Sequence, residues 1–230
     1  MGEEEPGLFL PRVVSGEVPE RRTPTNTRLA MTSKLIRTLA ALPLAAGLLV
    51  SAPALDAQEH VYVAIQGEAK IAVIDASTLE EIKRIDLTEL GFSENAKPHH
   101  IAVDPDGSHW YVSLIGENRV LKFDRGNRIV GQAEFEVPGL LIRAPESDRL
   151  YVGRSMSAVN PPTSIGEIDT GTMLVEEADV FFPRPHALEY VPSVGRVFSA
   201  SLAQNQMGSL DAESFDMELL NLEGPVHTLV

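Results

Sequence analysis

Four of the six histidines are the residues of this chain best placed to do chemistry. Each follows a proline by one or two residues, and they are His99, His100, His186 and His227. A neutral imidazole can ligate a transition metal or lie over a haem, so His100, His186 and His227 are predicted as a metal-binding set. The alternative is a structural role in which each ring hydrogen-bonds the backbone and caps a strand. His60 and His109 lack this spacing and are expected to be solvated.

The prolines beside these histidines belong to a repeat. Pro98, Pro138, Pro185 and Pro225 open successive units at intervals of 40, 47 and 40 residues. A period of 40 to 50 residues built from short strands is typical of a β-propeller, in which each repeat forms one four-stranded antiparallel sheet, or blade. The sequence therefore predicts an all-β propeller with about four blades. Innermost strands surround a central channel, so the four histidines and Arg184 are expected at one mouth of that channel as ligand-binding residues.

The clearest unit shows how one blade is built. Residues 101–103 form a short apolar strand, and the turn that follows it is Asp104-Pro105-Asp106-Gly107, in which proline presets φ and glycine accepts a positive φ. Residues 110–114 and 119–124 are predicted as the second and third strands. Residues 129–137 alternate between apolar and polar side chains, which favours a half-exposed outer strand.

This unit resembles a known repeat. The run from Pro98 to Gly107, then Trp110-Tyr111-Val112 and residues 118–124, is similar to the YVTN-type propeller repeat of bacterial surface-layer and YncE-like periplasmic proteins. The resemblance covers essentially residues 60–230. It implies a propeller that usually has seven blades and is related to the propeller domains of haem-containing nitrite reductase, nitrous oxide reductase and quinohaemoprotein amine dehydrogenase. It is specific for the fold and implies no particular activity.

The two ends of the repeat region leave its completeness open. The first strand, at residues 61–65, matches the second strand of a blade and has no inner strand before it. Residues 225–230 match an inner strand with no blade after it. Either the second segment completes the first blade and closes a four-bladed ring, or the chain is a truncated part of a larger propeller. We expect truncation, with an open arc that self-associates through free strand edges.

The N-terminal part of the chain is predicted to be separate from the fold. Residues 31–57 read as a secretory signal peptide, with a basic start, an apolar run at residues 39–50 and cleavage after Ala57. The apolar run is shorter than the roughly 20 residues that a membrane span needs. Residues 1–30 are predicted to be a disordered or mis-assigned extension. A periplasmic or secreted protein without a membrane span follows, with the propeller domain at residues 58–230.

Charge and cysteine content exclude several classes of partner. Residues 58–230 carry 13 Lys and Arg against 27 Asp and Glu, and such an acidic surface repels nucleic acid. The chain has no cysteine, which excludes disulfides, thiolate metal sites and covalent haem attachment through cysteine.

The sequence contains no phosphate-binding loop, zinc-protease motif or nucleophile elbow. The leading prediction is therefore a non-enzymatic, exported propeller that binds a small molecule or a protein at the channel mouth, with no cofactor. The alternative is a redox propeller whose histidines hold copper, iron or haem. Arg143, Arg154 and Arg184 are a weaker indication of positive charge on the channel face.

Overall fold

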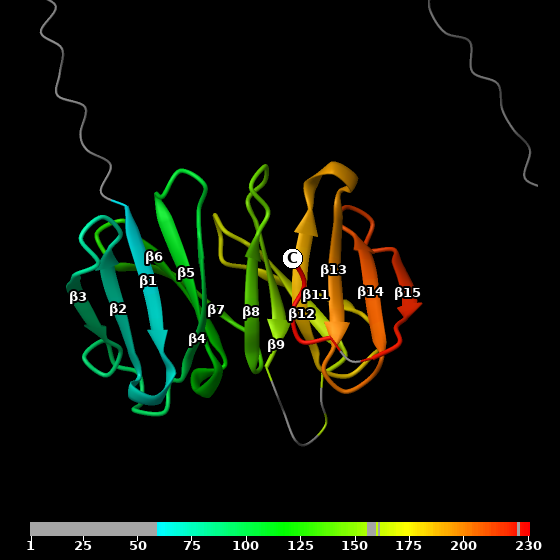
Figure 1. The fold of residues 1–230 in the computed structure, drawn as a ribbon, viewed down its shortest axis with the longest axis horizontal. Helices are drawn as coiled ribbons and strands as arrows, with labels where there is room; N and C mark the ends of the chain where they lie inside the picture. The colour runs from blue at the N-terminus through cyan, green and yellow to red at the C-terminus, as the bar shows by residue number, and fades with distance from the viewer. Residues whose placement is uncertain (1–58, 156–159, 161, 225) are drawn as a thin grey trace, which may run out of the picture. The chain divides into compact units, whose positions relative to one another are not determined.

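The computed structural model describes residues 59–155, 160, 162–224 and 226–230, and these form four antiparallel sheets (Figure 1). The predicted extension and signal peptide, residues 1–57, lie outside the described residues. The first sheet has three strands, β1 (His60–Ile65), β2 (Lys70–Asp75) and β3 (Glu81–Asp86). The second has β4 (Pro98–Val103), β5 (His109–Leu114), β6 (Arg119–Asp124) and β7 (Ile129–Glu134). The third has β8 (Pro138–Arg143), β9 (Arg149–Arg154), β10 (Ser164–Asp169) and β11 (Val175–Asp179). The fourth has β12 (Pro185–Val191), β13 (Arg196–Ser201), β14 (Gln206–Asp211) and β15 (Met217–Asn221).

Each sheet is a meander whose strands pair in chain order, as expected for the predicted propeller blades. The predicted Asp-Gly turn is confirmed: the Gly107 N–H donates to the Asp104 carbonyl at 2.8 Å, and Gly107 has a φ of +66°. Single turns of 3-10 helix, η1 (Gln66–Glu68) and η2 (Ile115–Glu117), follow β1 and β5. Both end on a residue in the left-handed conformation. A third such turn, η3 (Pro192–Val194), follows β12 and also ends on a left-handed residue, so the place of β1 in its sheet is decided by its contacts with other strands.

Three hydrophobic clusters hold neighbouring sheets together. Between the first and second sheets, the Trp110 ring stacks on Tyr62 from β1 at 4.6 Å and on Phe123 from β6 at 4.1 Å. The second and third sheets meet at a cluster that includes Tyr111, and the third and fourth at one that includes Tyr151. Alternate residues of each middle strand therefore face opposite neighbours, which is why these strands are apolar on both faces.

The first strands of the second, third and fourth sheets lie side by side, since β4 contacts β8 and β8 contacts β12. β1 contacts β4 in the way that β5 contacts β8 and β9 contacts β12. It is therefore the second strand of its blade, as predicted, and the described part of the first sheet has no inner strand.

Two predictions about strands are wrong. Residues 226–230 form no strand and do not pair with β1, so the ring-closing pairing is not formed in the part of the chain that the structure describes. The outer strand of the second sheet ends at Glu134 rather than at residue 137. The Phe135 N–H still donates to the Asn118 carbonyl at 2.9 Å, in the register of β6 and β7. Asn118 has a left-handed φ of 52° and ends the partner backbone, so the Val137 N–H donates to the Asn118 side chain at 2.9 Å.

Candidate functional site

The histidines meet at the starts of two inner strands. His99 on β4 and His186 on β12 each follow the proline that opens their strand, and their ring centroids lie 5.8 Å apart. The strand between them, β8, has Gly139 at the same place after Pro138. A Cβ at this glycine would lie 2.7 Å from the Arg154 backbone. The Arg154 carbonyl also binds the His186 ring, so the packing at position 139 leaves no room for a side chain.

The tautomers of these two rings follow from their partners. Nδ1 of His99 lies 3.3 Å from the Gln66 side-chain oxygen, and Nδ1 of His186 lies 3.0 Å from the Arg154 carbonyl. Because both partners are acceptors, both Nδ1 atoms carry the hydrogen. In the neutral rings each Nε2 then presents a lone pair, and Nε2 of His99 is buried without a hydrogen-bond partner.

Burial keeps these rings neutral. It lowers the pKa of His99, and the nearby His186, His100 and His227 lower it further. Burial likewise lowers the pKa of His186, against the opposing effect of its bond to the Arg154 carbonyl. Two uncharged imidazoles, of which His99 has an unpartnered Nε2, can accept hydrogen bonds from a ligand or bind a transition-metal ion.

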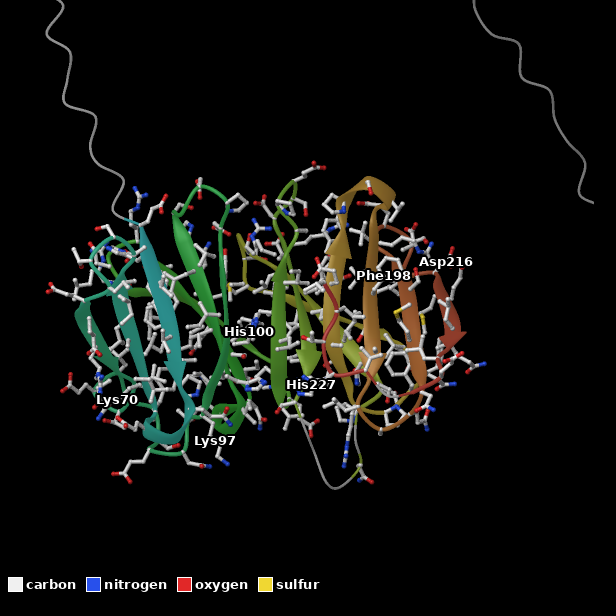
Figure 2. All side chains as sticks on the ribbon, viewed as in Figure 1. Lys70, Lys97, His100, Phe198, Asp216 and His227 are labelled. Carbon is white, nitrogen blue, oxygen red and sulfur yellow. The ribbon has the colours of Figure 1, made fainter. Side chains whose placement is uncertain are left out.

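The third member of the group is His227 rather than His100. The segment after β15 turns back toward β12 (Figure 1, red), and the exposed His227 ring, labelled in Figure 2, lies 5.2 Å from the His186 ring. His100 instead binds the next sheet, since its Nδ1 accepts the Leu141 N–H at 3.2 Å. Burial lowers its pKa too. The capping alternative, in which a ring hydrogen-bonds the backbone, therefore describes both His100 and His186; "the histidine cluster" below means His99, His186 and His227.

The arginines do not line a common channel face. Arg154 is 2% exposed, pairs with Glu177 at 2.5 Å and lies 3.7 Å over the Phe135 ring. Arg143 pairs with Asp104 at 2.7 Å. The prediction that these two supply free positive charge is wrong, because partners distant in the sequence neutralise them. Arg184 is half-buried just before β12, and its N–H donates to the Pro162 carbonyl at 3.1 Å.

A second group of polar side chains lies at the opposite end of β4, around residues that the sequence predicted only as a turn. The Asp104 carboxylate accepts from Arg143, lies 3.2 Å from Nδ1 of His109 and accepts from the Tyr111 hydroxyl at 3.3 Å. Burial, and then Asp104, raises the pKa of Tyr111 to about 12. A cavity of about 580 Å³ lies here; in its lining, Asp104 and Arg143 pair with each other across two sheets, and Lys122 donates to the Thr170 carbonyl at 2.7 Å.

The prediction that His60 and His109 are solvated is also wrong. His109 is half-buried against Asp104, and His60 is half-buried, with its ring edge toward Tyr62 at 6.3 Å between centroids. Among the described residues, no group of three or more His, Asp or Glu side chains is placed to hold a metal ion. The predicted metal site stays a prediction. No helix within the described residues has the length and apolar character of a membrane span.

No protein-family model matches the sequence, and no curated protein matches it. Several solved structures do match. Hydrazine synthase of Kuenenia stuttgartiensis is 17% identical, with a TM-score of 0.59 over 70% of this chain and 46% of that one. Virginiamycin B lyase of Staphylococcus aureus is 16% identical, with a TM-score of 0.58 over 72% of this chain and 53% of that one. A streptogramin B lyase is 14% identical, with a TM-score of 0.59 over 71% and 51%.

At these identities the likeness shows the fold alone. The chain spans about half the length of these proteins. Its sheets, their order and their stacking are those of β-propeller blades, and by fold the chain is a β-propeller protein.

Proposed function

We propose that this protein is an exported, YncE-like binding propeller whose ligand or partner docks on the histidine cluster. The observation that carries the proposal is the unpartnered, buried Nε2 of His99 beside the His186 ring. A buried polar atom without a partner costs free energy, about 1–3 kcal/mol, and a bound donor group removes that cost. The ligand is therefore a small molecule or protein segment that presents N–H or O–H groups.

The neighbouring groups support this role. Gln66 and the Arg154 carbonyl fix both rings through Nδ1, so the Nε2 lone pairs are oriented before the ligand arrives. Binding then orders few additional side chains, which favours affinity. The structure of a catalytically inactive virginiamycin B lyase with quinupristin is an example of a protein of this fold that holds an organic molecule.

A capture experiment tests the binding role. The protein is immobilised and exposed to a periplasmic extract, beside a His99→Ala, His186→Ala variant and a His109→Ala control. Partners retained by the wild type and the control but lost from the double variant support the proposal. Equal retention by all three proteins contradicts it, and so does catalytic turnover by the isolated, metal-free protein.

Export is a separate part of the proposal and has its own test. The protein is expressed with all 230 residues in a bacterium with a periplasm, and the N-terminus of the periplasmic form is sequenced. A start at Gln58 is expected. A cytoplasmic protein that keeps residues 31–57 contradicts export without affecting the binding site.

A redox or metal-dependent propeller is the second candidate. The lone pair on His99 and the Nδ1 bond that holds its ring are what a metal-ligating histidine needs. Imidazole is a donor that suits copper or iron, but the described side chains include no group of three placed to hold a metal ion. Metal analysis of protein from its native host, with a His99→Ala, His186→Ala, His227→Ala variant, decides between the candidates. Equal and negligible metal in both proteins rejects this one.

A further inference from the structure

One face of the first sheet is of the kind that packs against a neighbouring blade, and no other described residue covers it. Val61 and Val63 of β1 are 49% and 43% exposed. Their equivalents on β5 are Trp110 and Val112, which are 1% and 0% exposed because the preceding sheet covers them. β1 therefore exposes the face that in the second sheet forms an interior contact.

The same sheet also lacks its inner strand. β1 takes the place of a second strand, so its edge toward the inner position has no ladder partner in the described residues. An unpaired strand edge offers a row of N–H and C=O groups to another strand. Surface and edge together form a binding site for one strand and one sheet face.

The other end of the described fold carries the complementary pieces. Residues 226–230 follow Pro225 as residues 99–103 follow Pro98, so their sequence pattern is that of an inner strand. On the fourth sheet, Phe198 takes the place that Tyr111 and Tyr151 occupy on earlier sheets, where each faces the next sheet. The exposed Leu220 lies on the same face, two strands further out.

We infer that the occupant is a second copy of this chain, arranged head to tail about a twofold axis. Residues 226–230 of each copy supply the inner strand of the other copy's first sheet, and the Phe198 face of each covers the partner's β1. Two copies then close a ring of eight four-stranded blades, within the range known for propellers. The matched part of this chain covers about half of each of these solved propellers, so the matched blades of two copies together supply about as much chain as one such propeller.

The register of the new strand pair follows from the second sheet. There Ile101 lies opposite Val112. The corresponding residues are Thr228 and Val63, so Thr228 of one copy should lie opposite Val63 of the other. Leu229 then takes the place of Ala102, and its side chain points toward the partner's second sheet.

Disulfide trapping tests this register directly, because the chain has no cysteine of its own. Full-length Val63→Cys and Thr228→Cys variants are mixed and oxidised. Opposite residues of paired strands lie about 4.5–5.5 Å apart at Cα, within the span of a disulfide. We expect a mixed dimer of twice the 25.0 kDa chain on a non-reducing gel. A mixture of Thr228→Cys with Leu79→Cys, whose residue lies in an exposed turn, should stay monomeric on that gel.

Sedimentation of the full chain tests the assembly without cross-linking. The wild type should sediment as a dimer, and a Val61→Glu, Val63→Glu variant as a monomer with an unchanged circular dichroism spectrum, since both side chains are already exposed. A monomeric wild type, a dimeric charged variant, or a mixed disulfide no stronger than the control overturns the proposal. A series of growing oligomers also overturns it, because an open head-to-tail contact does not close.

Discussion

The histidine cluster makes the stability of this protein depend on pH, and His186 is the residue through which this can be measured. Its side chain is 4% exposed, and burial lowers its pKa in the folded state. As the pH falls below about 6.5, the ordinary value for histidine, the unfolded chain takes up a proton at this position before the folded chain does. The free energy of unfolding therefore falls with pH, and the loss ends below the folded-state pKa.

The contribution of His186 to this change in the free energy of unfolding has an upper limit. One histidine that is neutral in the folded state and charged in the unfolded state contributes at most about 1.4 kcal/mol per pH unit. Between pH 6.5 and pH 5 the contribution of His186 is therefore at most about 2 kcal/mol, which corresponds to roughly 1 M in a urea midpoint. Carboxylates with ordinary pKa values titrate mainly below this window.

Urea unfolding of the wild type and of a His186→Gln variant, at several pH values between 5 and 7.5, measures this contribution. Glutamine keeps a donor for the Arg154 carbonyl and removes the titration. The stability of the variant should fall less steeply below pH 6.5, whereas a His109→Gln control should keep the steep fall. Identical slopes for His186→Gln and the wild type would refute the argument from burial.

Three further predictions concern buried contacts. Arg154→Met should lower the free energy of unfolding by about 2–4 kcal/mol, because two carbonyls and Glu177 lose their donor. Glu177→Gln should lower it by less than about 1 kcal/mol, since Glu177 is half exposed. Equal losses for the two variants in chemical denaturation would contradict this explanation. Gly139→Ala should destabilise the protein by about 1–3 kcal/mol, because the new methyl group meets the Arg154 backbone, while Gly67→Ala, with open space around it, should be near neutral in the same assay. Tyr111 should not ionise below about pH 11, because its pKa is raised to about 12, so folded stability should decline as the pH rises from 10 towards 12. A Tyr111→Phe variant with an unchanged alkaline decline in thermal melts, or with less phenolate absorbance than the wild type below pH 11, would count against it.

The fold was predictable because its signals are local and repeated. β6 begins at Arg119 and ends at Asp124 as predicted, since turn residues bound it on both sides and its apolar positions fit a strand. The end of β7 was not predictable, because it depends on the left-handed turn at Asn118, which ends the backbone of the neighbouring strand and leaves the Val137 N–H to bind the Asn118 side chain. A contact between residues 19 positions apart leaves no trace in the local pattern.

The sequence predicted that histidines gather at the starts of inner strands, which the structure confirms, but not which ones, and their role as a binding site stays a prediction. Consecutive residues of a strand point to opposite faces, so whether His99 or His100 meets His186 depends on the position of each residue along its strand. The signal that could have decided it is the count from the proline, since His99 and His186 both stand one residue after it. Arg143 and Arg154 pair with residues that are distant in the sequence, and a local sequence pattern does not predict such pairs.

The two central proposals fail independently, although they meet at one segment. His227 belongs both to the histidine cluster and to the strand that would close the ring, so a change at His227 tests neither idea cleanly. His186→Gln alters the cluster and leaves β1 untouched, while Val63→Glu alters β1 and lies on no strand that carries a cluster histidine. A pH slope of stability that changes only in the first variant would assign the titration to the starts of the inner strands. A sedimentation mass that changes only in the second would assign assembly to the uncovered face of the first sheet.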